Sequence, residues 1–171
     1  MSVRGVIETR SAGETARAGV ALAGLLEPDD VIVLTGDLGA GKTTLTQGVA
    51  RGLGIEAPVV SPTFNILVVH HGRLTLNHLD LYRLTREATL EDIDFYATLE
   101  SGGVSLVEWG DRFPGALPQD RLQVALHVEA ADRRSIQVEG HGERSSALAA
   151  GWMAATAAAA ESGSGTGEGI G

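Results

Sequence analysis

The stretch Gly36–Thr43, which reads GDLGAGKT, contains the residue types that hold a phosphate chain. Its glycines allow successive backbone N–H groups to turn toward one side and form a concave anion-binding nest. Lys42 is the only lysine in the chain, beside twelve arginines, and it can reach the β- and γ-phosphates as a point charge. The hydroxyl of Thr43 can bind Mg²⁺. This G-x4-G-K-[ST] pattern therefore predicts a nucleotide-binding P-loop.

Such a loop works only between a strand and a helix, and the flanking sequence predicts both. The run Val31–Thr35 is short, apolar and β-branched, which is typical of a strand buried on both faces of a parallel sheet. After the glycines, Leu45, Val49 and Leu53 recur four residues apart, and Gly54 can close the predicted helix. The phosphates would then lie at a helix N-terminus, the positive end of its dipole.

The remaining elements predict an α/β domain. Ser11-Ala12-Gly13-Glu14 has the spacing of a capping box, so we expect a helix to begin at Ser11. The other expected elements are strands at 65–70, 74–79 and 104–107, a helix at 90–99, and a closing pair of strands with one solvated face at 122–128 and 136–138. We therefore expect a three-layer P-loop NTPase-type domain with a mixed, mainly parallel sheet.

Two carboxylates and one hydroxyl-bearing loop could complete the site. Asp80 and Glu108 each follow a predicted strand, where an α/β fold brings side chains to the ligand crevice. A carboxylate there can bind the Mg²⁺ shell or orient an attacking water. The turn-prone Ser61-Pro62-Thr63 carries hydroxyls that can sense the metal or the γ-phosphate. The predicted roles are catalytic for Lys42, Asp80 and Glu108, metal-binding for Thr43 and Glu108, and switch-like for Ser61 and Thr63.

Charge and composition exclude several classes of protein. A net charge of −9 and a pI near 4.9 leave no broad basic face for gripping nucleic acid, so any nucleic acid would be held mainly by a partner. The absence of cysteine excludes disulfides and thiolate metal sites. No run approaches the roughly 18 apolar residues of a membrane span, and no apolar secretory signal opens the chain. We therefore expect a cytoplasmic protein.

The chain of 171 residues suits one domain, but its composition changes after Gly142. The segment 143–171 is rich in alanine, glycine and serine, with little to bury. We expect a frayed helix there, followed by a disordered tail. The predicted boundaries are 1–142 for a P-loop ATPase domain and 143–171 for the tail.

Four stretches occur in the order and spacing of one known family: GDLGAGKTT, SPTF (61–64), HLDLYRL (78–84) and VEWGDR (107–112). The chain resembles the bacterial TsaE (YjeE) family from about Glu8 to Arg134. The resemblance implies a small ATPase that uses ATP and Mg²⁺. It also implies a role in forming N6-threonylcarbamoyladenosine (t6A) at position 37 of tRNAs that read codons starting with A. The implied partner is a TsaB–TsaD heterodimer that ATP hydrolysis resets, with tRNA contacted only through that complex.

The resemblance further implies a set of nucleotide-contacting residues: Ser11, Leu38, Gly39, Ala40, Gly41, Lys42, Thr43, Thr44, Asp80 and Arg134. For Ser11 the capping role is a sufficient explanation by itself. Arg133 lies beside Arg134, so the register of this basic position is open by one residue. Trp109 follows the metal carboxylate, as in relatives, and either packing or a functional contact explains it.

Other functions remain open at this stage. A P-loop small-molecule kinase usually carries a lid with several arginines, and here only Arg83 and Arg86 lie near, in a short segment. A nucleotide-dependent interaction module would need no hydrolysis. A GTPase is disfavoured, because the stretch Asn77–Asp80 resembles N-K-x-D only with histidine for lysine and no D-x-x-G follows. No arginine finger can be assigned, and a partner could supply one.

Overall fold

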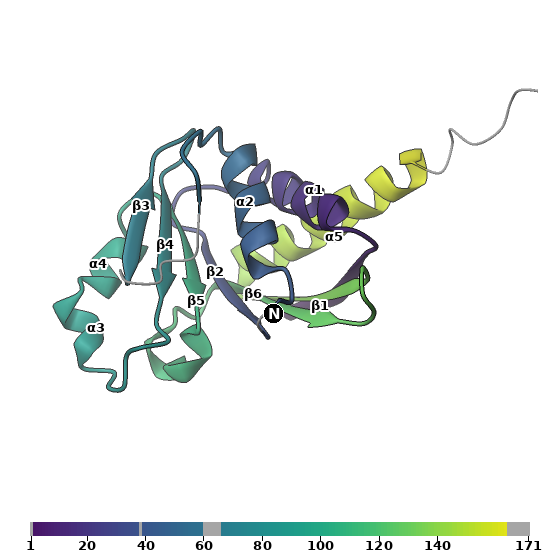
Figure 1. Ribbon diagram of the computed structural model, residues 1–171. Coiled ribbons are helices and arrows are strands. Elements are labelled where there is room, and N and C mark those ends of the chain that lie inside the picture. Colours follow the sequence, from purple (N-terminus) through teal and green to yellow (C-terminus); the bar gives the residue numbers. More distant parts are fainter. Residues whose placement is uncertain (1, 38, 60–65, 164–171) are drawn as a thin grey trace, which may run out of the picture.

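The computed structural model describes residues 2–37, 39–59 and 66–163, which form a seven-stranded mixed sheet between helices (Figure 1). The strand order is β1-β7-β6-β2-β5-β4-β3. The parallel strands β6, β2, β5 and β4 form the centre, whereas β1, β7 and β3 add antiparallel pairs at the two edges. The strands are β1 (Ser2–Thr9), β2 (Val31–Gly36), β3 (Leu67–His70), β4 (Leu76–Asp80), β5 (Val104–Glu108), β6 (Arg121–Val128) and β7 (Arg134–His141).

Helices cover the two faces of the sheet unequally. One face carries α1 (Ala12–Ala23), α2 (Lys42–Gly52) and α5 (Glu143–Gly163). The other carries α3 (Thr89–Asp92), α4 (Phe95–Leu99) and the 3₁₀ turns η1 (Gly110–Arg112) and η2 (Pro114–Ala116). Strand β2 joins the two cores, because Ile32 and Leu34 lie in the first and Val33 in the second. The predicted fold class and the strand buried on both faces are confirmed.

Glycines at the contact allow the backbones of α1 and α2 to approach each other closely. A Cβ at Gly48 would overlap the carbonyl of Ala16, and one at Gly19 would overlap the carbonyl of Leu45. At the ends of the two helices, Thr15 lies beside Gly41 and Ala23 lies beside Gly52. The two helices therefore run in the same direction, with their N-termini at the same end.

The strand pair β6–β7 is antiparallel and has one solvated face, as predicted. Buried and partly exposed residues alternate along the first six residues of β6. Leu122, Val124 and Leu126 enter the core beneath α5, while Gln123 and Ala125 face the opposite side. The sequence analysis did not predict β1, which pairs with β7 over its whole length. Its pattern is weak, since most of its side chains are exposed or half-buried.

The single helix predicted at 90–99 is wrong. The chain instead forms two short helices, α3 and α4, separated at Asp94, whose φ is 55°. An α-helix cannot continue through a residue in the left-handed region, which aspartate enters more readily than most residues.

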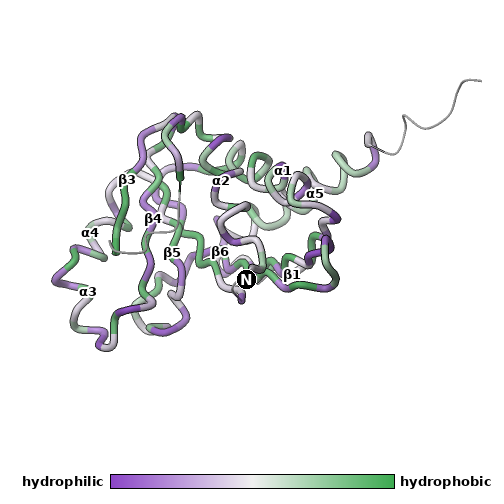
Figure 2. Tube along the Cα trace, viewed as in Figure 1, coloured by the Kyte–Doolittle hydropathy of each residue, from purple (hydrophilic) through white to green (hydrophobic). Residues whose placement is uncertain are grey.

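The domain boundary at Gly142 also needs correction for the described residues. Residues 143–163 form the continuous helix α5, and Leu148, Ala149 and Trp152 on it are buried. Trp152 is fully buried and its Nε1 donates to the carbonyl of Ala18 at 2.8 Å. Side chains at the start of α5 add polar contacts, since Arg144 bonds to Asp30 and Ser145 bonds to Asp120. The rest of the helix has a pale hydropathy colour in Figure 2. Residues 164–171 lie outside the described residues.

Within the described part of the chain, no helix combines the length and the apolarity needed to cross a membrane.

Candidate functional site

The turn between β2 and α2 leaves a helix N-terminus without a cap. Gly39 and Gly41 have φ values of 81° and 102°, a region that glycine enters freely. Gly41 is the N-cap of α2 and makes no side-chain hydrogen bond. The N–H of Leu45 donates to the carbonyl of Gly41 at 2.9 Å, so the N–H groups of Lys42 to Thr44 have no acceptor within the helix. Such groups can bind an anion.

Lys42 is the first residue of α2, and its side chain is mostly covered. Its side chain is 14% exposed, and its Nζ is 3.9 Å from Oε1 of Glu108 and 5.0 Å from the ring centroid of Trp109. A pocket of about 240 Å³ adjoins it, lined by Thr35, Gly36, Asp37, Lys42, Trp109, Asp111 and His127. The ammonium group therefore sits between a carboxylate, an indole and an open pocket.

The two predicted carboxylates meet at one edge of the sheet. Strands β4 and β5 are parallel and pair Asp80 with Glu108, so both strands end side by side. Burial raises the pKa of Asp80, and the negative charge of Glu108 raises it further, while the N–H of Tyr82, bonded at 2.9 Å, opposes the shift. The structure thus brings Lys42, Asp80 and Glu108 together.

The donors present fit Mg²⁺ bound with a nucleotide better than a metal held by protein alone. Among the described residues, no group of three or more histidine, cysteine, aspartate or glutamate side chains could hold an ion. The site offers one buried carboxylate, Glu108, and the exposed hydroxyl-bearing Thr43 in the first turn of α2. Mg²⁺ typically binds one or two carboxylates and completes its shell with phosphates and waters. The residues present therefore fit this ion.

Two further predicted residues flank the turn. The Oγ of Ser11 accepts the N–H of Glu14 at 3.0 Å, so the predicted serine cap is confirmed. The return bond differs from a capping box, because Glu14 accepts the N–H of Arg10 at 2.6 Å rather than that of Ser11. Arg134 begins β7, and its guanidinium donates to the carbonyl of Gly39 at 3.4 Å. Arg134 is therefore the arginine that contacts the glycine-rich turn, while Arg133 is exposed.

Three predicted residues, Leu38, Ser61 and Thr63, lie outside the described residues, and their roles stay predictions. The sequence analysis missed His78, which is buried at 2% exposed and whose Nε2 lies 2.7 Å from Oε2 of Glu108. His78 precedes Asp80 by two residues on β4, so the two side chains lie on the same face of the strand. This two-residue period was the sequence signal that could have identified His78.

An aromatic pair covers one side of the site. Trp109 has a φ of 62° and is 37% exposed, so it is not a core residue. Its ring lies 5.0 Å from that of Tyr82, and the guanidinium of Arg112 lies 5.9 Å from the same tyrosine ring. Arg112 also donates to the carbonyl of Tyr82. Trp109 therefore packs against Tyr82 and Lys42 at the lining of the pocket beside α2.

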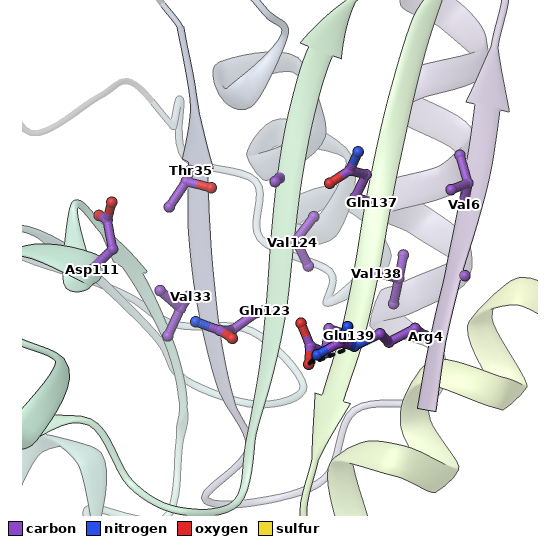
Figure 3. Close-up of a pocket in the computed structure, with 12 residues that line it drawn as sticks. Arg4, Val6, Val33, Thr35, Asp111, Gln123, Val124, Gln137, Val138 and Glu139 are labelled. Atoms are coloured by element: carbon purple, nitrogen blue, oxygen red, sulfur yellow. Dashed lines mark hydrogen bonds and ion pairs between the residues drawn. The ribbon is translucent and has the colours of Figure 1, made fainter. Parts of the chain in front are cut away.

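A larger pocket of about 510 Å³ lies on the solvated face of the sheet (Figure 3). Its floor includes Gln123 of β6 and Gln137 of β7, and at one end Arg4 and Glu139 form an ion pair of 2.7 Å. Thr35 and Asp111 line both this pocket and the one beside Lys42, so the two adjoin. Lys42 lines the smaller pocket, whereas neither Asp80 nor Glu108 is among the residues that line it.

A mixed sheet, a glycine-rich turn ending in lysine, and carboxylates at the ends of neighbouring parallel strands define a domain of the P-loop class. A family model described as "Threonylcarbamoyl adenosine biosynthesis protein TsaE" matches residues 9–136. The chain belongs to this family, whose members act in tRNA threonylcarbamoyladenosine biosynthesis. The resemblance read from the sequence is thus confirmed.

Two relatives and one solved structure show the extent of the likeness. The TsaE protein of Treponema pallidum is 45% identical over 130 residues, covering 76% of this chain and 96% of the relative. That of Bacillus subtilis is 44% identical over 123 residues, covering 71% and 77%. The crystal structure of Bacillus subtilis YdiB matches with a TM-score of 0.77 at 35% identity, covering 90% of this chain and 97% of that one.

Proposed function

We propose that this chain is an Mg²⁺-dependent ATPase that serves the formation of t6A at position 37 of tRNAs reading codons that start with A. The observation that carries the proposal is the uncapped N-terminus of α2, which presents Lys42 opposite the paired Asp80 and Glu108. An anion is the natural partner of such a terminus, and the two carboxylates supply the groups that metal binding and water activation need.

The proposed roles follow from position. The backbone of residues 38–44 and the ammonium of Lys42 hold the phosphates, and Arg134 supports the loop through Gly39. Thr43 and Glu108 hold Mg²⁺, which when bound neutralises charge on the phosphate oxygens. Asp80 orients the attacking water. Its raised pKa makes it a better proton acceptor than an ordinary aspartate, provided it is ionised.

Ser11 has two compatible roles. Its Oγ uses a lone pair to cap α1. The hydroxyl hydrogen is then free to donate to the nucleotide, because a hydroxyl is both donor and acceptor.

The proposed partner is a TsaB–TsaD heterodimer in the cytoplasm, which ATP hydrolysis resets for further turnovers. The net charge of −9 supports contact with tRNA through that complex rather than directly. Ser61 and Thr63 would respond to the γ-phosphate.

The test is steady-state ATP hydrolysis by the chain alone, then with a purified TsaB–TsaD heterodimer and tRNA. We expect weak activity that the heterodimer raises sharply. No response to the heterodimer, with phosphate appearing instead on an added small molecule, would establish a kinase. If Lys42→Ala or Glu108→Ala still supports t6A formation, the chain is a nucleotide-dependent interaction module whose hydrolysis is incidental.

A further inference from the structure

A buried hydrogen bond joins His78 to Glu108 beneath the glycine-rich turn. The Nε2 of His78 lies 2.7 Å from Oε2 of Glu108, and the two side chains are 2% and 7% exposed. His78 pairs with Leu106 across the parallel strands, so its partner carboxylate is two residues further along β5 on the same face. The contact is therefore a diagonal one between neighbouring strands, fixed by the sheet register.

The two oxygens of Glu108 have different surroundings. Oε2 is bonded to His78, whereas Oε1 faces the ammonium of Lys42 at 3.9 Å, too far for a hydrogen bond. The terminal torsion of a glutamate is broad and roughly two-fold. Lys42 alone would leave that torsion loosely defined, so the bond from His78 fixes the plane of the carboxylate, with one oxygen on His78 and the other directed toward Lys42.

The surroundings of the ring indicate where its proton lies. The Nδ1 of His78 is buried and has no hydrogen-bond partner among the described residues. A buried N–H without an acceptor is rarer in proteins than an under-used acceptor. The arrangement with least penalty places the proton on Nε2, where it is donated to the carboxylate, and leaves only a lone pair unpaired on Nδ1.

We propose that His78 is a positioning residue, whose Nε2–H holds Oε2 of Glu108 and thereby aims Oε1 at the ion bound with the nucleotide. This inference rests on the proposed function, because it assigns a task to a carboxylate that binds Mg²⁺ there. Partners of this kind orient a ligand without touching the metal, and their loss typically weakens metal affinity or activity about 10- to 100-fold.

The neighbouring His70 offers a matched control. It lies on β3, is buried at 9% exposed, and its Nε2 also has no partner among the described residues. Burial lowers the pKa of His70, and the electrostatic effects of His78 and His71 lower it further. His70 therefore lies close to His78. Among the contacts of the described residues, none joins His70 to Glu108. Replacing it therefore changes the same buried region without changing the carboxylate.

The first experiment measures binding of a non-hydrolysable ATP analogue by calorimetry over a range of Mg²⁺ concentrations. The variants are His78→Asn, whose amide is too short to reach Glu108, His78→Gln, whose amide reaches the place of Nε2, and His70→Asn. We expect His78→Asn to weaken the apparent Mg²⁺ affinity about 10- to 100-fold, with analogue binding in chelator unchanged. His78→Gln should recover most of it, and His70→Asn should match the wild type.

A merely structural His78 would lower thermal stability but leave Mg²⁺ affinity intact in all three variants, which would overturn the inference. Equal losses in His78→Asn and His78→Gln would overturn it too. A wild-type chain without Mg²⁺-dependent analogue binding would instead overturn the proposed function itself. The second experiment uses the nucleotide-free wild type, in which ¹⁵N spectra of the imidazole rings should show His78 as the Nε2–H tautomer. An Nδ1–H tautomer would contradict the inference whatever the variants do.

Discussion

Helices α1 and α2 lie against each other in the same direction, but they begin in opposite ways. At the start of α1, Ser11 is extended and its side chain satisfies the N–H of Glu14. At the start of α2, Gly41 is left-handed and offers no side chain. The first turn of α1 carries the favourable acidic Glu14, whereas α2 begins with Lys42, whose charge opposes the helix dipole. The protein caps one terminus with its own side chain, whereas the other has no side-chain cap, as the proposed phosphate site requires.

The largest expected effect concerns the support of α1. Trp152 of α5 is fully buried and bonds to the carbonyl of Ala18, so Trp152→Ala should lower the free energy of unfolding by about 3–5 kcal/mol. Urea denaturation followed by circular dichroism measures this. The control is Trp109→Ala, which removes the half-exposed tryptophan beside α2 and should change stability far less. A loss for Trp152→Ala as small as the one expected for Trp109→Ala would show that α5 is not part of the folded core.

Next comes the charge at the start of α2. Lys42→Ala should lower the rate of ATP hydrolysis about 10²- to 10³-fold, as the loss of one preorganised charge-stabilising group does. The nucleotide-free variant should be no less stable, because the substitution removes a positive charge from a helix N-terminus. Steady-state kinetics and thermal unfolding measure the two quantities. The control is Arg51→Ala in the last turn of the same helix. If Lys42→Ala hydrolyses ATP at the wild-type rate, the charge at the start of α2 does not serve the reaction. The proposed functional difference between the starts of α1 and α2 would then be wrong.

A smaller effect separates the two roles of Ser11. Ser11→Ala should cost about 1 kcal/mol of stability through the lost cap, and Ser11→Gly only a few tenths. Both remove the hydroxyl, so both should weaken nucleotide affinity by the same amount, about 2- to 10-fold for one hydrogen bond. Chemical denaturation and calorimetry give the two values. If neither variant changes the affinity, Ser11 is a cap alone.

The smallest effect concerns Asp80, which faces the uncapped terminus. Its raised pKa means that the folded protein holds this proton more tightly than the unfolded chain. Stability is therefore lost as the pH rises from the ordinary value of 3.8 through the folded pKa. Asp80→Asn should melt at a higher temperature than the wild type at neutral pH, and the difference should vanish below pH 3.8. Asp132→Asn, at an exposed position, is the control. A variant less stable than the wild type at neutral pH would contradict the assigned shift.

Local patterns predicted the features that depend on a few adjacent residues. The cap at Ser11, the glycine-rich turn and the carboxylates at the ends of β4 and β5 all follow from spacing along the chain. Features decided by distant contacts were missed. The anchoring of α5 depends on Trp152 reaching α1, and β1 is stabilised by its pairing with β7 rather than by its own pattern. The bond from His78 to Glu108 depends on sheet register, which no single strand reveals.

The most direct test of the uncapped terminus is a calorimetric titration of the wild-type chain with ATP, ADP and AMP in the presence of Mg²⁺. If the start of α2 and Lys42 hold the phosphates, affinity falls with each phosphate removed and AMP binds far more weakly than ATP. AMP binding as tightly as ATP would show that the phosphates make no use of this terminus.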